Sequence, residues 1–389
     1  MTDDMGRDEW LAALRQRVPE IPVTDARARQ LAGALLVDVR EDSERASGLP
    51  EGALGLSRGF LELRIEQVAP DRQREILLLC GSGQRSLLAA EALQRMGYTR
   101  VASVVGGMAA WKTAGLPVSA TTLDADAAER YARQVLLPQI GEAGQARLGA
   151  ARIAVIGAGG LGSPVLLYLA AAGVGRLTLI DDDRVERSNL HRQVVHADAR
   201  VGVSKADSAR MALLALNPRV DVRVVVDRLR ADNVEALLDG HDVVIDGADN
   251  FPTRYLLAAA TRRLGVPLVY AAIERFTGQA SVFDPRREDS PCYRCLFPEP
   301  PSAADAPNCS DAGVLGVLPG LVGLVQATEA MKLVLGIGQP LVGRLLTYDA
   351  LGMRFRELAL HRDPHCPGCG PAARFDGYVD IERMCASAG

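Results

Sequence analysis

A set of glycines followed by an aspartate has the spacing of a nucleotide-binding site. Gly157, Gly159 and Gly162 come directly after the apolar run 153–156, and a second apolar run ends at Asp181. Glycines let the backbone turn sharply and approach a phosphate, N–H groups at a helix start attract an anion, and a carboxylate after the next strand accepts hydrogen bonds from a ribose. The pattern predicts a strand, turn, helix and strand that bind an adenine nucleotide, for which NAD is the usual candidate.

Side chains farther along the chain favour phosphate chemistry over hydride transfer. Arg192 and Lys205 supply positive charge, and Asp249 and Asn250 follow another apolar run. Attack of a carboxylate on the α-phosphate of ATP needs such cations to stabilise the developing charge, and it needs a carboxylate to hold Mg²⁺. The alternative is structural: the two cations lie on a solvated face, and Asp249 or Asn250 caps a helix whose first turn contains Pro252.

Cys80 is a second chemical position, at the end of the apolar run 76–79. The loop after it reads Gly-Ser-Gly-Gln-Arg-Ser and leads into an expected helix at 87–96. The amides of such a loop converge on one point, where Arg85 and the helix dipole favour a thiolate. We therefore expect Cys80 to be a nucleophile. The alternatives are a small buried hydrophobe and a cysteine phosphatase, whose loop has one residue more between cysteine and arginine.

Two Cys-x-x-Cys pairs lie in the second half of the chain. Cys292 and Cys295 form the first pair, and Cys366 and Cys369 form the second. Four thiolates from two such pairs close a tetrahedral site that suits structural zinc, and the alternative is a redox pair. Cys309 follows a proline-rich segment and is either a second nucleophile or a spectator thiol.

Composition limits the class of protein. The 389 residues are 48% hydrophobic with a net charge of −4, which allows two or three domains and shows no basic excess for nucleic acid. The N-terminal residues lack the apolar core of a signal peptide, and the most apolar segment, 314–325, is interrupted by glycines and a proline and is too short to span a bilayer. Because the paired cysteines also fit a reducing compartment, we expect a soluble cytoplasmic protein with no nucleic-acid or membrane partner.

The elements that position these residues form two α/β domains. We expect a polar segment at 1–19, a first domain at 20–118, a linker of small and polar residues at 119–127, a second domain with the metal site at 128–372, and a tail at 373–389.

The first domain resembles a rhodanese, a sulfurtransferase module. The resemblance rests on Val-Asp-Val-Arg at 37–40, on Cys-Gly-Ser-Gly-Gln-Arg-Ser at 80–86, and on the segment 106–117, Gly-Gly-Met-Ala-Ala-Trp-Lys-Thr-Ala-Gly-Leu-Pro. It implies that Cys80 carries a persulfide sulfur, that the loop amides cradle this sulfur, and that Arg85 supplies charge.

The second domain resembles the bacterial relatives of ubiquitin-activating enzymes, which are the molybdopterin-synthase and thiamine sulfur-carrier adenylyltransferases. The motifs are the glycine turn, the segment 182–193 with Lys205, and the segment 242–254. The resemblance implies a Rossmann-like domain with a mixed sheet, and a homodimer in which Arg133 reaches into the ATP site of the partner. It also implies that Asp181 holds the ribose, that Asp249 binds Mg²⁺, and that further contacts with ATP come from Gly159, Gly160, Asn189, Arg192, Gln193, Lys205, Asn250 and Arg254.

Together the two resemblances imply one reaction sequence. The second domain adenylates the C-terminal glycine carboxylate of a small ubiquitin-like sulfur-carrier protein, and sulfur from Cys80 displaces AMP directly or through Cys309. Reduction then leaves a thiocarboxylate. The sulfur donor is either thiosulfate or a cysteine desulfurase. The pathway served stays open among molybdenum cofactor, thiamine, tRNA thiolation and a secondary metabolite. Two other classes are alternatives: a nicotinamide-dependent oxidoreductase, and a non-catalytic scaffold that docks carrier proteins.

Overall fold

The chain folds into two compact units. The structure, a computed structural model, describes residues 6–45, 48–119, 123–300 and 313–378. Contacts between residues divide the chain into Met1–Glu142 and Ala143–Gly389, and each unit is described by itself. The finer domain boundaries stay predictions.

The first unit is built on a parallel sheet with strand order β1-β6-β5-β2-β4 among its described residues. The apolar runs predicted around 35–38 and 76–79 are its central strands β2 and β5, which are buried because helices cover both faces. The elements are α1 (Arg7–Arg15), β1 (Glu20–Ile21), α2 (Val23–Leu31), β2 (Leu35–Asp38), α3 (Asp42–Arg45), β3 (Leu49–Pro50), β4 (Leu54–Gly55), η1 (Arg58–Phe60), α4 (Leu61–Val68), β5 (Ile76–Leu79), α5 (Gln84–Arg95), β6 (Val101–Val104), α6 (Gly107–Thr113), β7 (Val118–Ser119), α7 (Ala125–Arg130) and α8 (Ala132–Val135).

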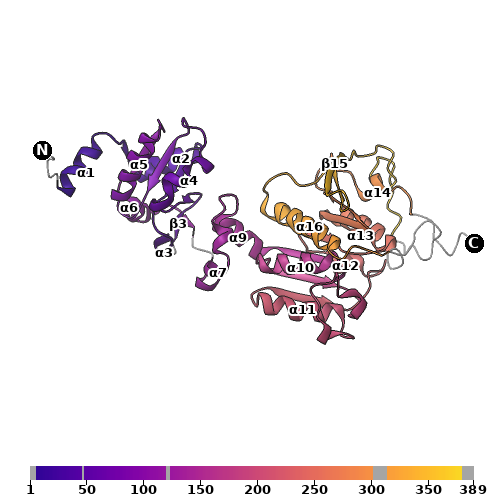
Figure 1. Ribbon diagram of the computed structural model, residues 1–389. Coiled ribbons are helices and arrows are strands. Elements are labelled where there is room, and N and C mark those ends of the chain that lie inside the picture. Colours follow the sequence, from indigo (N-terminus) through magenta and orange to yellow (C-terminus); the bar gives the residue numbers. More distant parts are fainter. Residues whose placement is uncertain (1–5, 46–47, 120–122, 301–312, 379–389) are drawn as a thin grey trace, which may run out of the picture. The chain divides into compact units, whose positions relative to one another are not determined.

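Two separate apolar clusters hold the first unit together. One lies between the sheet and α1, α4 and α5, and the other packs the opposite face of the sheet against α2 and α6 (Figure 1). Helix α5 starts at Gln84, three residues earlier than the expected start at residue 87. Arg85 and Ser86 therefore lie in the first turn of the helix, where free N–H groups and the positive dipole end are nearest to Cys80.

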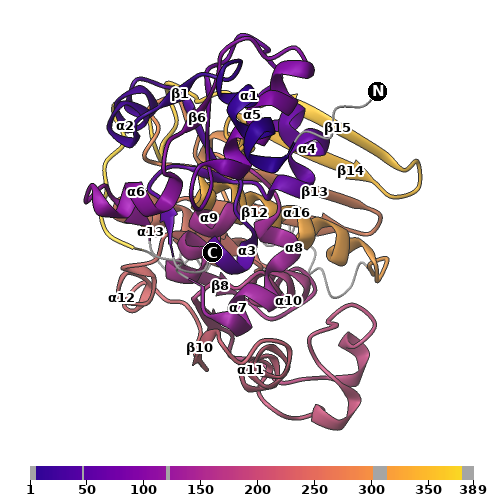
Figure 2. The same cartoon turned by 90° about the vertical axis from the view of Figure 1, so that its left-hand side faces the viewer.

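The second unit contains a mixed sheet with strand order β10-β9-β8-β11-β12-β13-β14-β15 in its described part. The first five of these strands are parallel, and the last three are antiparallel neighbours. Figure 2 shows the β14–β15 hairpin at the edge of the sheet. The strands are β8 (Arg152–Ile156), β9 (Arg176–Ile180), β10 (Asp221–Val225), β11 (Val243–Asp246), β12 (Leu268–Glu274), β13 (Thr277–Phe283), β14 (Arg344–Asp349) and β15 (Arg354–Ala359).

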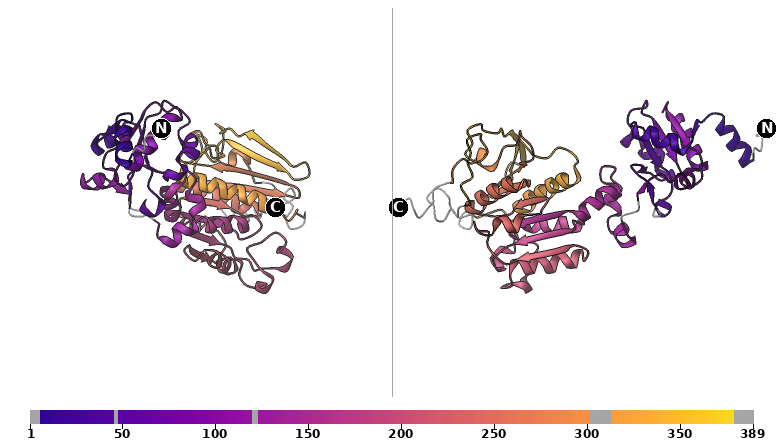
Figure 3. Two further views of the ribbon diagram at one scale, coloured as in Figure 1. Left: turned by 60° about the vertical axis from the view of Figure 1, so that its left-hand side comes forward. Right: turned by 180° about the vertical axis from the view of Figure 1, so that it is seen from behind.

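Helices cover both faces of this sheet. Helices α10, α11 and α16 lie side by side, while α13 lies on the strands β11 and β12 and packs against α12 (Figure 3). The strand order reverses next to β8, which is the point where parallel sheets of this kind bind ligands. The helices are α9 (Gly141–Ala150), α10 (Gly162–Ala171), η2 (Arg187–Asn189), η3 (Asp198–Arg200), α11 (Lys205–Leu216), α12 (Val234–Leu238), α13 (Phe251–Leu264), α14 (Tyr293–Leu296) and α16 (Leu318–Leu335).

The prediction that the apolar segment 314–325 is too short to span a bilayer is wrong about its length. Helix α16 continues to Leu335, and its 18 residues are long and apolar enough to cross a membrane by length and composition alone. Half of that stretch is buried inside the unit, where the Gln326 side chain donates hydrogen bonds to the Asp246 and Val269 carbonyl oxygens at 2.7 and 3.1 Å. These contacts are those of a core helix.

Candidate active site

Cys80 lies at the end of β5, and hydrogen-bond donors are directed at its sulfur. Its side chain is buried, the Gly83 N–H donates to Sγ at 3.1 Å, and the Ser86 hydroxyl lies 3.5 Å from Sγ. Gly107 approaches the loop so closely that a Cβ atom there would lie 2.2 Å from the Cys80 carbonyl oxygen. The same loop conformation needs the positive φ of Gly83. A thiolate or a persulfide at this position would be stabilised by the convergent donors.

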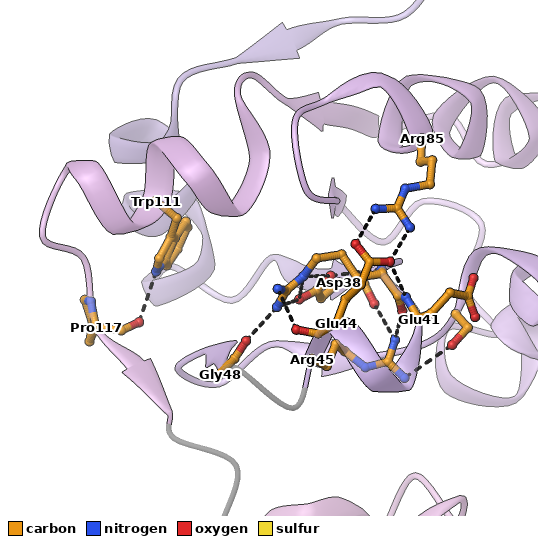
Figure 4. Close-up of polar contacts among 10 residues, drawn as sticks. Asp38, Glu41, Glu44, Arg45, Gly48, Arg85, Trp111 and Pro117 are labelled. Carbon is orange, nitrogen blue, oxygen red and sulfur yellow. Dashed lines mark hydrogen bonds and ion pairs between the residues drawn. The ribbon is translucent and has the colours of Figure 1, made fainter.

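Arg85, which the rhodanese resemblance expects to supply charge, is paired with an acid. Its guanidinium donates two hydrogen bonds of 2.6 Å to the Glu44 carboxylate (Figure 4). This pairing lowers the pKa of Glu44 to about 2 and raises the pKa of Arg85 further above its ordinary value. The sequence analysis missed Glu44, since nothing local connects a residue in the 41–45 segment to the Cys80 loop.

The Val-Asp-Val-Arg motif at 37–40 positions the segment that carries Glu44. Arg40 and Asp38 form a buried ion pair at 2.7 Å, and Arg40 also donates to the carbonyl oxygens of Glu44 and Gly48 at 3.1 and 2.6 Å. Arg45 adds a hydrogen bond to the Arg40 carbonyl oxygen. A buried, fully bonded pair of this kind fixes a single loop conformation, because breaking it would leave an unpaired buried charge.

A cavity of about 1430 Å³ opens in the second unit, next to the glycine turn and the ends of β8, β9 and β11. It brings together most of the residues that the sequence predicted for the nucleotide. The predicted residues that line it are Gly159, Gly160, Asp181, Arg192, Gln193, Lys205, Asp249, Asn250 and Arg254.

The glycine turn is close-packed and held from two sides. A Cβ atom on Gly162 would lie 1.9 Å from the Gly157 carbonyl oxygen, so the turn between β8 and α10 requires glycine there. The Ala158 N–H donates to Asp181 Oδ2 at 2.7 Å, and the Ala158 carbonyl oxygen accepts from His196 Nε2 at 3.0 Å. No pattern in the sequence points to His196, which is buried and whose burial lowers its pKa to about 4.

Asp181 and Lys205 lie on the β9 side of the cavity. Asp181 Oδ1 accepts a second hydrogen bond from the Asp183 N–H at 2.8 Å, and burial raises the pKa of Asp181. Lys205 Nζ bonds Asp183 Oδ2 at 2.8 Å, and the lysine side chain is only 8% exposed. The alternative that Lys205 lies on a solvated face is therefore excluded.

Arg192 is fixed by Asn189 rather than by an acid. Its Nη2 donates to Asn189 Oδ1 at 2.7 Å. Arg192 lines the cavity and Asn189 does not, so Asn189 orients the cation from outside the cavity wall. The neighbouring Gln193 is buried, and its Oε1 has no hydrogen-bond partner in the described part of the chain. A buried acceptor at a cavity wall is costly to leave unpaired, so Gln193 is suited to meet a ligand.

Asn250 and Arg254 have structural roles beside the cavity. The Asn250 side chain accepts from the Thr253 N–H at 3.0 Å and caps α13, as the structural alternative predicted, while Asp249 is exposed in the cavity wall. Arg254 is buried and donates to the Ala248 carbonyl oxygen at 2.9 Å, and its Nε lies 3.5 Å from Asp246 Oδ2.

Asp246 was missed by the sequence analysis. Its Oδ1 accepts from the Ala248 N–H at 3.0 Å, so Asp246 and Arg254 hold the Ala248 peptide from both ends. Burial raises the pKa of Asp246 to about 6, and the positive charge of Arg254 opposes this rise. The pair fixes the backbone directly before Asp249.

The four cysteines of the two Cys-x-x-Cys pairs lie together, with their sulfur atoms within 4.8 Å of one another. The Sγ atoms of Cys292 and Cys366 are 3.6 Å apart, those of Cys295 and Cys369 are 3.4 Å apart, and those of Cys292 and Cys295 are 4.0 Å apart. A tetrahedral ion with metal–sulfur bonds of about 2.3 Å separates its sulfur ligands by about 3.8 Å. The cluster therefore has the size of a closed tetrahedral metal site. Cys309 lies outside the described residues.

The fold and these sites define a two-part α/β protein: a unit with a cysteine in a donor-lined loop, and a Rossmann-like unit with a cation-lined nucleotide cavity. The ThiF family matches residues 131–368, and the Rhodanese-like domain matches residues 23–114. The chain belongs to the ThiF family and carries a rhodanese-like domain before the ThiF region.

Curated relatives are similar over about two thirds of this chain. The SAMP-activating enzyme E1 of Haloferax volcanii is 52% identical over 263 residues, which is 68% of this chain and 96% of that protein. The sulfur carrier protein adenylyltransferase of Thermus thermophilus is 52% identical over 66% of this chain and 96% of that protein. The probable adenylyltransferase/sulfurtransferase MoeZ of Mycobacterium tuberculosis is 47% identical over 68% of this chain and 67% of that protein.

Solved structures support the fold. The crystal structure of Escherichia coli MccB superimposes with a TM-score of 0.57, covering 67% of this chain and 76% of that chain at 19% identity. The likeness confirms the predicted α/β class with a mixed sheet.

Proposed function

We propose that this chain adenylates the C-terminal glycine carboxylate of a small ubiquitin-like sulfur-carrier protein and then converts it to a thiocarboxylate with sulfur from Cys80. The single observation that carries the proposal is the presence, in one chain, of a donor-lined Cys80 loop and a cavity that gathers Asp181, Arg192, Lys205 and Asp249. Family membership and relatives named as adenylyltransferases and sulfurtransferases support it.

In the adenylation step, the cavity binds ATP and positions its α-phosphate. The residues fit this substrate, because the turn at Gly157 and Gly162 leaves no room for side chains, and because the unpartnered Gln193 Oε1 needs a donor, which the hydroxyl and amino groups of ATP can supply. Arg192 and Lys205 stabilise the charge that develops as the carrier carboxylate attacks and pyrophosphate leaves. Asp249, which faces the cavity, would hold Mg²⁺, which offsets the phosphate charge when bound.

In the sulfur step, a persulfide on Cys80 attacks the carbonyl carbon of the acyl-adenylate. A carbon–sulfur bond forms and AMP leaves, which joins the carrier to Cys80 through an acyl disulfide. A thiol reductant then cleaves the sulfur–sulfur bond, releasing the thiocarboxylate and leaving Cys80 in a mixed disulfide that a second thiol resolves. Cys309 would act as a relay in this step if the two sites do not meet directly.

The cysteine cluster would hold structural zinc. All four sulfur atoms are engaged in one closed group, so no position is left for a substrate. Burial raises the pKa of Cys292 and Cys295, so these thiols would ionise only with a bound cation to compensate. We also propose a homodimer in which Arg133, exposed on α8, reaches the ATP site of the partner, and a cytoplasmic location.

The deciding experiment is mass spectrometry of candidate carriers incubated with the protein, MgATP, a sulfur donor and a thiol. We expect the wild type to replace one carboxylate oxygen by sulfur, Cys80→Ala to stop at the acyl-adenylate, and Asp249→Ala to lose both products. Cys309→Ala reports whether a relay exists. A carrier that binds but is neither adenylated nor sulfurated would favour the scaffold alternative, and tight binding of NADH would favour the oxidoreductase.

A further inference from the structure

The sulfur donor for Cys80 is open between inorganic thiosulfate and an organic persulfide. Thiosulfate carries two negative charges and releases sulfite, which is also a dianion, so its use is favoured by uncompensated positive charge beside the cysteine. The Cys80 loop contains one cationic side chain, Arg85. The state of this arginine therefore bears on the class of donor.

The Arg85 charge is compensated beside the Cys80 loop, in a pair that solvent reaches. Its two hydrogen bonds of 2.6 Å to Glu44 use the bidentate geometry that binds carboxylates most strongly. The two side chains are 38% and 39% exposed, so the pair faces solvent. A Cβ atom on Gly81, the neighbour of Cys80, would lie 3.3 Å from Arg85 Nη2 and 3.8 Å from Glu44 Oε1. Both charges thus lie over the residue next to the nucleophile.

Glu44 is held in this position by contacts that do not involve Arg85. The Glu44 carbonyl oxygen accepts from Arg40 Nη1 at 3.1 Å, and its Oε2 accepts from the Glu41 N–H at 3.2 Å. Arg40 is itself fixed by its buried pair with Asp38. These contacts therefore hold the Glu44 carboxylate in position to pair with Arg85 (Figure 4).

We propose that Glu44 selects the sulfur donor: by neutralising Arg85 it disfavours thiosulfate and leaves Cys80 to be loaded from an organic persulfide, R–S–SH. The inference rests on the proposed sulfur-transfer function. In the loading step the Cys80 thiolate attacks the outer sulfur, which moves to Cys80 with its proton. The sulfur–sulfur bond of the donor breaks, and its electron pair leaves on R–S⁻. With thiosulfate the same attack would release sulfite, beside an arginine whose charge Glu44 already compensates.

The test compares two donors on the full-length chain. Rapid mixing and mass spectrometry measure how fast each donor loads Cys80. The two donors are thiosulfate and the persulfide of N-acetylcysteamine, which has no carboxylate. The wild type is expected to load faster from the persulfide. In Glu44→Gln the ratio of the thiosulfate rate constant to the persulfide rate constant should rise about tenfold, because Arg85 becomes an uncompensated cation.

A matched control is available in the same unit. Glu62 accepts two hydrogen bonds from Arg58 at 2.7 and 2.8 Å, and this pair, on η1 and α4, has side chains 29% and 37% exposed. Glu62→Gln should keep the wild-type ratio. Combining Glu44→Gln with Arg85→Gln should remove the tenfold gain, since the freed cation is then absent.

Three outcomes would overturn the proposal: a wild type that prefers thiosulfate, a folded Glu44→Gln with the wild-type ratio, or a double variant that keeps the gain. If Glu44→Gln does not fold, the salt dependence of the wild type decides. Thiosulfate loading that varies little with ionic strength supports a compensated site, and loading that is steeply faster at low salt contradicts it. Failure of the proposed function looks different, because then neither donor loads Cys80 in the wild type.

Discussion

At the scale of single residues, chemistry depends on partners distant in the sequence. The Glu44 carboxylate that neutralises Arg85 is 41 residues away from it, and His196, which bonds the glycine turn, is 38 residues from Ala158. Both side chains change what the predicted residues do. One removes a free charge from the sulfur site, and the other fixes the peptide on which Asp181 also acts.

His196 makes the stability of the second unit depend on pH. Its folded pKa is about 4, against an ordinary value of 6.5, so between these values the unfolded chain binds a proton that the folded chain does not. The stabilisation is complete above about pH 6.5 and is lost as the pH falls toward 4. When the pH falls from about 7 to about 5, the free energy of unfolding of the wild type should decrease by about 1–2 kcal/mol more than that of His196→Gln.

Denaturant titrations at the two pH values measure this difference. Asp181 and Asp246, whose pKa values are raised, shift stability in the opposite direction, but they do so in both proteins and cancel in the comparison. An equal loss in the wild type and in His196→Gln would show that His196 is not the group responsible.

The residues of the candidate sites were predictable where the signal is local. Cys80, Asp181 and Lys205 each lie at the end of a strand or at the start of a helix, and the sequence shows these positions directly. Glu44 and His196 were not predictable, because a lone acid or histidine in a polar stretch has no spacing that points to its partner.

At the scale of elements, close backbone approaches decide where glycine is required. Gly107 begins α6 with φ 56°, and a Cβ atom there would lie 2.2 Å from the Cys80 carbonyl oxygen. Gly107→Ala should lower the stability of the first unit by at least about 1–3 kcal/mol and should abolish loading of Cys80 with sulfur, because the loop has to move.

Gly59→Ala is the matched control, since a Cβ atom on Gly59 meets nothing within 4 Å and its φ is not positive. Thermal melts and persulfide loading of the two variants give the readout. Loading of Gly107→Ala at the wild-type rate would mean that the contact between α6 and the Cys80 loop is not needed for the reaction.

The same approaches explain where the predicted elements were wrong. The apolar segment 314–325 was predicted to be interrupted by glycines, yet Gly320 and Gly323 lie inside α16, which continues through them. A Cβ atom on Gly323 would lie 2.6 Å from the Leu161 carbonyl oxygen, so this glycine permits a close contact between α16 and the start of α10. A sequence pattern shows that a glycine is present, but it does not show whether it serves a turn or a contact. Strands β8, β9 and β11 were predictable because buried parallel strands are continuous apolar runs.

At the scale of the whole molecule, the division into two units was predictable from the change of motif, and the partner of each cysteine pair was predictable from spacing. The cluster connects parts of the chain that are 74 residues apart, since Cys292 meets Cys366 and Cys295 meets Cys369. Binding of one ion would therefore close a long loop in the second unit and leave the first unit unaffected.

This arrangement predicts that the two units respond differently to loss of the metal. Cys366→Ser should abolish stoichiometric zinc binding and lower the melting temperature of the second unit by about 10 °C or more, since several kcal/mol of binding energy are lost and each kcal/mol shifts a unit of this size by about 2–4 °C. Loading of Cys80 with sulfur should stay at the wild-type level, because that site lies in the other unit.

Cys80→Ser, a cysteine substitution outside the cluster, is the control and should keep its zinc. Metal analysis, calorimetry and the loading assay on both variants decide the point: a metal-free wild type, or a Cys366→Ser protein whose second unit melts at the wild-type temperature, would show that the four cysteines do not form a structural metal site.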